Sequence, residues 1–149
     1  MTVIHLSTNI DCDVARCFDL ARSVDVHIKS ASKTRERAIA GRSSGLCEAG
    51  DVIVWEAIHF GITQRLTVQI TKMEKPFFFE DRMIDGAFKS MRHEHHFKEV
   101  DGKTIMVDKF EYTVPFGIFG KLFNVFVLRA YMKRFLRTRN SIIKSIAAK

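Results

Sequence analysis

The first thirty residues alternate between polar and apolar positions in two different periods. Residues 3–8 alternate singly, as a half-buried strand does, and residues 9–13 supply turn and N-cap side chains. From Val14, apolar residues recur at the i, i+3, i+4, i+7 spacing of a helix that buries one face. The same spacing returns between Val24 and Ala31. The pattern therefore predicts a strand followed by two short helices.

The middle of the chain has the period of strands. Glycine- or proline-containing connections separate most of the six apolar-rich segments, and Phe60-Gly61-Ile62 and Asp101-Gly102 have the composition of tight hairpin turns. Residues 41–51 form the longest irregular stretch and are a candidate rim loop. The predicted strands are 35–40, 52–60, 62–73, 77–84, 90–99 and 104–114.

The last segment, from about Ile118 to the C-terminus, contains no helix breaker. At a rise of 1.5 Å per residue, about 30 helical residues form a rod of roughly 45 Å. Residues 122–128 are apolar on nearly every side, so we expect them to be covered by protein or by lipid. Lys121, Asn124 and Arg129 interrupt the segment too often for a membrane span. Packing of this helix against the sheet is therefore the favoured arrangement.

Length, composition and cysteine content limit the class of protein. A chain of 149 residues has the usual size of one domain, and its composition is that of an ordinary folded protein. Cys12, Cys17 and Cys47 form no Cys-x-x-Cys motif, and the N-terminus lacks the pattern of a secretory signal. We therefore expect a cytoplasmic protein with reduced thiols.

The formal charge of +7 is concentrated at one end of the chain. No acidic residue follows Glu111, whereas residues 1–111 hold 16 Lys and Arg against 17 Asp and Glu, a net charge of −1. This basic segment is either the solvated face of an amphipathic helix or a surface for phosphate or anionic lipid, and the first is favoured. Weak peripheral membrane contact through the basic C-terminal helix is the lesser alternative. The eight cations are Lys121, Arg129, Lys133, Arg134, Arg137, Arg139, Lys144 and Lys149.

The order of the elements, together with several short motifs, resembles the START-like superfamily, also called SRPBCC. This superfamily includes polyketide cyclases, coenzyme Q-binding proteins and plant Bet v 1-type proteins, and the bacterial cyclase/dehydrase-like members are the most similar. The resemblance implies one α+β helix-grip domain over residues 1–149, in which a curved seven-stranded antiparallel sheet wraps around the C-terminal helix. The motifs are Gly50-Asp51, Trp55, His59-Phe60-Gly61, Asp81, Gly86-x-Phe88, His93-x-His95-x-Phe97, Asp108, Tyr112 and Pro115-x-Gly117.

Strand parity indicates which side chains face the helix. Alternate residues of a strand point to opposite faces, so the apolar phase that contains Gln64 and Leu66 should face inward together with Trp55 and His59. If Asp101-Gly102 is a two-residue turn, residues whose numbers sum to 203 oppose each other across it. The resulting pairs are His95 with Asp108, Phe97 with Met106, His93 with Phe110, and Met91 with Tyr112.

Two apolar surfaces that face each other predict an internal cavity for a small hydrophobic molecule, such as a lipid, quinone, isoprenoid or polyketide-like compound. The cavity is expected between the sheet and residues 118–135. The expected wall of the cavity also carries polar side chains. Asp81 faces the same side as these groups if the turn at residues 86–88 contains a β-bulge. The candidate ligand-binding residues are Trp55, His59, Gln64, Leu66, Asp81, Met91, His93, His95, Phe97, Met106, Asp108, Phe110, Tyr112, Leu122 and Phe126.

Three interpretations of the polar residues stay open. They can form a satisfied network that fixes sheet register, or they can orient a mostly apolar ligand by a few hydrogen bonds. In the third, His95 is a general base oriented by Asp108 in a cyclase or dehydratase reaction. A binding module is favoured over an enzyme because no nucleophile, phosphate-cradling loop or second well-placed acid is identifiable.

Metal and nucleic-acid binding are the remaining alternatives, and neither is favoured. His93 and His95 share a face, and His59 or Asp108 could complete a zinc set, but a strand sends Glu94 and His96 to the other face. The outer face of the sheet offers no aromatic platform for nucleic-acid bases. We therefore expect no metal, no cofactor and no nucleic-acid partner, and the oligomeric state stays open.

Overall fold

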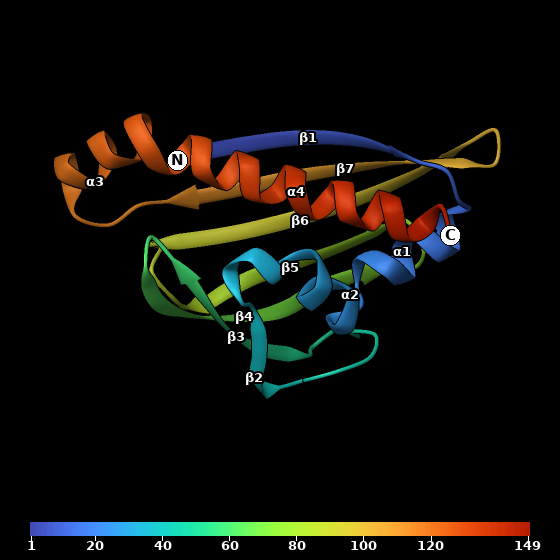
Figure 1. The fold of residues 1–149 in the computed structure, drawn as a ribbon, viewed down its shortest axis with the longest axis horizontal. Helices are drawn as coiled ribbons and strands as arrows, with labels where there is room; N and C mark the ends of the chain where they lie inside the picture. Colours follow the sequence, from blue (N-terminus) through green and yellow to red (C-terminus); the bar gives the residue numbers. More distant parts are fainter.

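One antiparallel sheet and the helices on its inner face make up the structure, a computed structural model that describes residues 1–149 (Figure 1). The strands are β1 (Thr2–Ile10), β2 (Arg37–Gly41), β3 (Val52–His59), β4 (Ile62–Glu74), β5 (Phe78–Asp85), β6 (Ser90–Val100) and β7 (Lys103–Thr113). The helices are α1 (Val14–Ala21), α2 (Val24–Ser30), the 3-10 turn η1 (Ser32–Thr34), α3 (Gly117–Phe123), the π-helical turn η2 (Asn124–Leu128) and α4 (Arg129–Ala147). The predicted α+β helix-grip fold is confirmed.

The sheet has the strand order β1-β7-β6-β5-β4-β3-β2, so the first strand lies beside the last one. Both predicted hairpin turns have two residues. Phe60 and Gly61 adopt φ of 55° and 72°, and Asp101 and Gly102 adopt 52° and 77°, the left-handed conformation that a type I′ hairpin turn requires at both positions. These turns set the register, which pairs His95 with Asp108, as predicted, and Trp55 with Leu66.

The long helix α4 lies along the inner face of the sheet, and α1 and α2 pack beside its C-terminal half (Figure 1). Two apolar clusters result. One surrounds Trp55, Phe110 and Leu136 in the middle of the domain. The other joins α1 and the end of α4 to the sheet through Phe18, Phe97 and Ile143. The second cluster closes one end of the space between helix and sheet, so any cavity must lie toward the other end.

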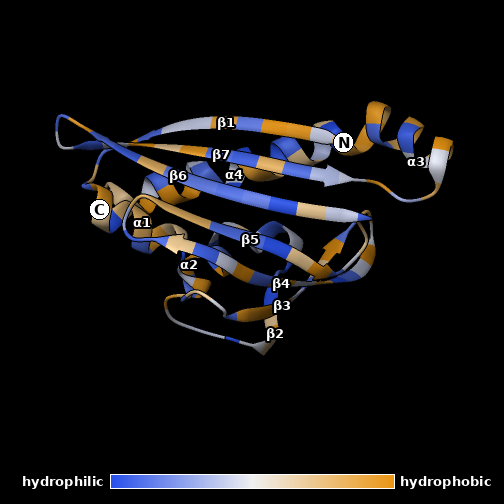
Figure 2. Cartoon of the chain, turned by 180° about the vertical axis from the view of Figure 1, so that it is seen from behind, coloured by the Kyte–Doolittle hydropathy of each residue, from blue (hydrophilic) through white to orange (hydrophobic).

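The segment 116–128 departs from expectation, because it projects beyond the strand ends instead of packing on the sheet (Figures 1 and 2). Only Gly120 and Asn124 of α3 and η2 are buried. A Cβ on Gly120 would lie 1.8 Å from the Pro115 carbonyl oxygen, so the backbone approaches there more closely than any side chain permits. The prediction that residues 122–128 pack against the sheet is therefore wrong for most of them, and Leu122 and Phe126 are 50% and 77% exposed.

Candidate ligand cavity and polar cluster

A cavity of about 560 Å³ lies between the sheet and the first half of α4. Its lining is mainly hydrophobic, with 18 apolar residues among 28. Eight of the sequence-predicted site residues belong to this lining, namely Trp55, His59, Gln64, Leu66, Asp81, Met91, His93 and Phe110. They come from β3, β4, β5, β6 and β7, and the curvature of the sheet brings them around one space. The predicted cavity therefore exists, bounded largely by inward-facing strand positions.

The other seven predicted residues do not line this cavity, which corrects the predicted wall. Phe97 and Met106 point inward as parity requires, but α1 and the end of α4 fill the space in front of them. His95 and Asp108 lie behind His93 in the polar cluster. Tyr112 turns its hydroxyl to Asn124, to which it donates at 2.5 Å, and Leu122 and Phe126 are exposed. Parity identifies the inward face of the sheet, but not which part of it another helix covers.

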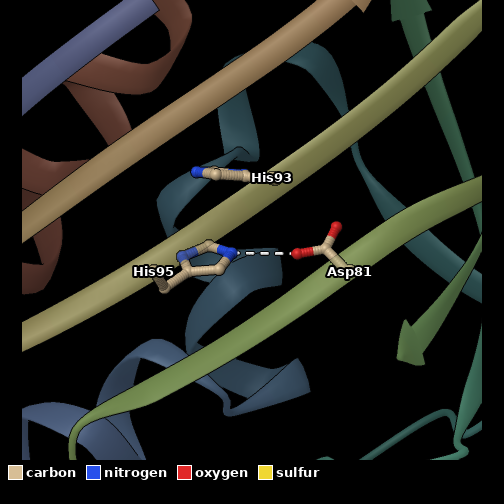
Figure 3. Close-up of side chains that lie close together, drawn as sticks. All are labelled: Asp81, His93 and His95. Carbon is tan, nitrogen blue, oxygen red and sulfur yellow. Dashed lines mark hydrogen bonds and ion pairs between the residues drawn. The ribbon is translucent and has the colours of Figure 1, made fainter. Parts of the chain in front are cut away.

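Two buried histidines and two aspartates form a connected polar cluster below the cavity floor. His93 Nε2 donates to Asp108 Oδ1 at 2.7 Å. His95 Nε2 donates to Asp81 Oδ1 at 2.9 Å, the contact drawn in Figure 3. His95 Nδ1 lies 3.4 Å from the same Asp108 oxygen. The ring centroids of His93 and His95 are 3.8 Å apart, and Phe79 stacks on His95 with a centroid separation of 4.1 Å. The predicted opposition of His95 and Asp108 is thus confirmed as strand register, while His93 makes the shorter hydrogen bond.

The long helix completes this cluster from the opposite side. Asn140 Nδ2 donates to Asp108 Oδ2 at 2.7 Å, so both oxygens of this fully buried carboxylate are hydrogen-bonded. Arg139 is only 3% exposed and lines the cavity. No carboxylate oxygen lies within 4.0 Å of its guanidinium nitrogens, and Arg139 makes no side-chain hydrogen bond. A buried cation without a direct partner is costly, and this one adjoins the empty space of the cavity.

Burial and hydrogen bonding shift the pKa values of the two histidines in opposite directions. Burial and the neighbouring His95 lower the pKa of His93 to about 4, against the attraction of Asp108. Burial also opposes protonation of His95, but its contacts with Asp108 and Asp81 outweigh that effect and raise its pKa. The hydrogen bonds from His93 and His95 hold the pKa of Asp108 well below its usual range in spite of burial. At neutral pH the arrangement therefore favours a neutral His93 and an ionised Asp108, while the two carboxylates shift His95 toward its protonated form.

A second set of polar side chains surrounds the cavity nearer its opening. His59 Nδ1 lies 2.5 Å from the hydroxyl of Tyr131, and burial lowers the pKa of His59. His27 stacks on Trp55 with ring centroids 4.1 Å apart, and its Nε2 is 2.9 Å from Glu36. The members of each pair are hydrogen-bonded to each other, whereas the buried Oε2 of Glu36 has no hydrogen-bond partner. They give the cavity wall a few fixed polar positions in an apolar surface.

Asp81, His93 and His95 form the one set of side chains that could hold a metal ion (Figure 3). Each offers one ligand atom, and these atoms lie within 4.8 Å of one another. Two features oppose a metal here. The Nε2 atoms of both histidines already donate to carboxylates, and the positive charge of Arg139 acts on Asp81 and Asp108. The arrangement fits a hydrogen-bonded network better than a divalent cation site.

Several polar residues of the site are not predicted from the sequence: Arg139, Asn140 and Tyr131 on α4, and His27 and Glu36 near the cavity opening. The three residues on α4 belong to a segment whose polar side chains are expected to face solvent. The signal was present in the helical period, because Arg139 and Asn140 follow Leu136 at i+3 and i+4 and precede Ile143 at the same spacings. Polar residues on the buried stripe of a helix indicate a polar feature in the core.

Solved structures share this architecture over nearly the whole chain. TTHA0849 from Thermus thermophilus superposes with a TM-score of 0.81 at 14% identity, covering 99% of this chain and 97% of that one. Ginseng major latex-like protein 151 from Panax ginseng gives 0.71 at 13% identity, covering 99% and 98%. A START superfamily protein from Mycobacterium smegmatis gives 0.73 at 7% identity, covering 97% and 98%. At such identities the likeness concerns the fold.

Sequence comparison assigns the family. No curated protein matches the chain by sequence. A family model described as polyketide cyclase / dehydrase and lipid transport matches residues 22–137, which include β2 to β7, the cavity lining from His27 to Leu136 and most of the polar cluster. The chain therefore belongs to the polyketide cyclase/dehydrase and lipid transport family.

Proposed function

We propose that this protein binds and carries a small, mostly apolar molecule in the cavity between the sheet and α4. The observation that supports this most directly is the cavity itself. Its volume of about 560 Å³ lies within the range of roughly 300 to 1,000 Å³ typical of small-molecule sites. An apolar wall with a few fixed polar groups suits a fatty acid, quinone, isoprenoid or aromatic polyketide. A well-packed core leaves no such space.

Arg139 supports a more specific feature of the ligand, an oxygen acceptor at its inner end. A guanidinium offers five N–H donors, and those of Arg139 have no protein acceptor. A carbonyl or carboxylate oxygen placed beside it would supply the missing hydrogen bonds. The apolar remainder of the ligand would extend past Trp55 and Leu66 toward the opening, where Phe60 and Phe123 line the cavity. His93, which also lines the cavity, has one ring nitrogen without a protein partner; because Nε2 donates to Asp108, this nitrogen is an acceptor in the neutral imidazole and suits a hydroxyl group of the ligand.

A thermal-shift series tests this proposal. Oleic acid, a short-chain ubiquinone, farnesol and an anthraquinone represent the four ligand classes. A ligand at roughly 100 times its Kd adds about 2.7 kcal/mol to stability, which corresponds to a Tm rise of about 5 °C or more. The buried Ala57 lines the cavity, so Ala57→Phe should place a phenyl ring in it and reduce the shift.

The matched control for this variant is Ile58→Phe, on the neighbouring residue of β3, which points to the other face of the sheet and should keep the shift. Absence of any shift across the four classes would count against the carrier proposal. A shift that is equal in the Ala57→Phe variant would place the ligand elsewhere on the protein.

A cyclase or dehydratase is the alternative function, and one observation favours it. His93 lines the cavity while Asp108 accepts from its other ring nitrogen, an arrangement in which a carboxylate orients a general base. His95 is less suited to this role than its sequence position suggested, because both of its nitrogens face carboxylates. The low pKa of His93 makes it a weak base, which favours binding over catalysis.

Turnover measurements separate the two functions. If the protein is an enzyme, His93→Gln should abolish conversion of a bound polyketide or β-keto substrate with little change in affinity, a loss confined to the transition state. His96→Gln, which changes an exposed histidine on the same strand, should leave turnover intact. Under the carrier proposal the wild-type protein returns the substrate unchanged.

The thiols are consistent with a reducing compartment, and we propose that the protein acts in the cytoplasm. Cys12, Cys17 and Cys47 form no disulfide. Burial raises the pKa of Cys17 to about 12 and that of Cys47 to about 11, so neither is a reactive thiolate at neutral pH.

A further inference from the structure

The segment Phe116–Val127 exposes its hydrophobic side chains and buries only Gly120 and Asn124. Eight of the seventeen large hydrophobic residues that are exposed in the whole protein belong to these twelve positions. Phe116, Phe119 and Phe126 are 82%, 78% and 77% exposed. A helix on the surface of a globular protein normally has the reverse arrangement, because its apolar stripe packs against the core. Contiguous exposed apolar surface of this kind marks an interaction site.

The segment is held in place and is not a frayed end. Asn124, on the one side that faces the protein, accepts from the Tyr112 hydroxyl at 2.5 Å and donates to Thr2 Oγ1 at 2.8 Å. Gly120, one turn earlier, sits against the Pro115 carbonyl. These contacts tie α3 and η2 to β1 and β7 and hold the segment in place beyond the strand ends (Figure 2). The apolar surface is therefore preformed.

This surface is continuous with the opening of the cavity. Phe116 and Phe123 belong both to the exposed segment and to the cavity lining. Across the opening, the β3–β4 turn adds Phe60 and Ile62, which are 46% and 62% exposed and also line the cavity. The ring centroids of Phe60 and Phe123 are 5.6 Å apart. Whatever covers the projecting segment would thus also cover the route into the cavity.

The charges around the segment identify the partner. Lys121 lies within it, and Arg129, Arg134 and Arg137 follow on exposed positions of α4. Residues 112–149 contain no acidic side chain. A two-fold pairing of two copies through this segment would bring like charges together, with no carboxylate of the same segment to compensate them. An anionic lipid surface instead offers phosphates to the cations and hydrocarbon to the phenylalanines.

We propose that Phe116–Val127 is a membrane-docking segment, which inserts its phenylalanines into the interfacial region of an anionic bilayer and places the cavity opening on the lipid surface. No helix of the protein is long and apolar enough to cross a membrane. The contact is therefore an interfacial one, of the kind made by amphipathic anchors. The apolar contact comes from α3 and η2, and the basic residues of α4 assist it by charge rather than making the contact alone, which refines the sequence-based expectation.

Vesicle flotation of the full chain tests this inference. We expect the wild type to bind vesicles of phosphatidylcholine with phosphatidylglycerol, and to bind pure phosphatidylcholine much less. Removing two inserted phenylalanines with Phe119→Ser and Phe126→Ser should weaken binding about tenfold or more, as expected for lost burial of aromatic side chains. Phe77→Ser is the matched control, because Phe77 is 54% exposed in the turn at the other end of β4 and should be dispensable. All variants alter exposed side chains, so an unchanged Tm verifies their fold.

Charge and oligomer measurements complete the test. Lys121→Glu with Arg129→Glu should remove the preference for phosphatidylglycerol. Equal vesicle binding by the wild type and the double phenylalanine variant would overturn the proposal, as would a wild type that binds no vesicles. A dimer in light scattering that the phenylalanine substitutions dissolve, without vesicle binding, would assign the segment to a second copy instead. Ligand-induced Tm shifts should persist in these variants, so docking and cavity binding can fail independently.

Discussion

Asn140 on α4 donates its side-chain amide to Asp108 on β7 at 2.7 Å, and this bond ties the long helix to the polar cluster of the sheet. Asp108 is fully buried and is also hydrogen-bonded by His93. The carboxylate therefore acts as the common acceptor for residues of β6 and α4. The position of Asp108 explains how α4 is held in one place on the sheet, although the cavity separates the first half of the helix from the strands.

Replacing the amide should destabilise the fold. Asn140→Leu removes one donor from a buried carboxylate, and we expect a loss of about 1 to 3 kcal/mol in the free energy of unfolding. Urea unfolding followed by circular dichroism measures it. Ser141→Ala, at the next and exposed position of α4, should change stability little. An unchanged urea midpoint in Asn140→Leu would show that Asp108 does not depend on this bond.

The stability of the protein should depend on pH through His93. The pKa of His93 is lowered from 6.5 to about 4, so between these values the unfolded chain binds a proton that the folded chain does not. Stability is therefore lost as pH falls through this window, by about 3 kcal/mol for a shift of this size. His95 acts in the opposite direction, because its raised pKa gives stability that is complete below its unfolded value and is lost as pH rises through its folded one.

Urea unfolding at intervals from pH 4 to pH 8 measures this dependence. His93→Gln keeps a donor for Asp108 but cannot titrate, so its stability should fall less steeply on the acidic side than that of the wild type. His96→Gln changes an exposed histidine and serves as the control. Identical acid dependence in wild type and His93→Gln would contradict the assignment of a buried neutral imidazole.

Arg139 should determine affinity for oxygenated ligands. Replacing it with methionine keeps much of the length of the side chain and removes its donors, so a carboxylate or carbonyl ligand should bind about 10- to 100-fold more weakly. Isothermal titration with the ligand that gives the largest thermal shift provides the measurement. Arg137→Met, which alters an exposed arginine two residues earlier, is the control. Equal affinities in the two variants would remove Arg139 from the ligand site.

Metal removal should have no effect on the fold. The nitrogens of His93 and His95 that face Asp108 and Asp81 are engaged in hydrogen bonds, and a divalent ion would have to displace their protons beside a buried arginine. We expect dialysis against EDTA to leave Tm unchanged, and Co²⁺ to give no absorption band of a tetrahedral complex. A stoichiometric metal in purified protein, with a fall in Tm when it is removed, would instead assign Asp81, His93 and His95 as its ligands.

Strand positions proved easier to predict than helix environments. Two-residue turns with glycine fix register locally, so the pairing of His95 with Asp108 and the inward face shared by Trp55 and His59 followed from counting residues. The helix environments depend on contacts far apart in the chain. Whether Phe97 meets a cavity or α1, and whether Phe126 meets the sheet or solvent, is decided by where α1 and α3 lie. No local period contains that information.

The polar cluster illustrates the same limit within the site. Parity placed His93, His95 and Asp108 on one face, but which imidazole takes the shorter bond depends on side-chain torsions and on the crossing of α4. Arg139 shows this limit as well, because a basic residue in a basic segment is expected to face solvent. Its place on the stripe of Leu136 and Ile143 was the available indication.

Native mass spectrometry of freshly purified protein provides a direct test of the carrier proposal, because a molecule held in the cavity adds its own mass to the folded protein. The carrier proposal predicts one additional mass of a small lipophilic compound on the folded wild type, absent after denaturation and much reduced in Ala57→Phe, whose phenyl ring obstructs the cavity. A protein that emerges empty from native extracts, and stays empty after incubation with oleic acid, ubiquinone, farnesol and anthraquinone probes, would contradict it.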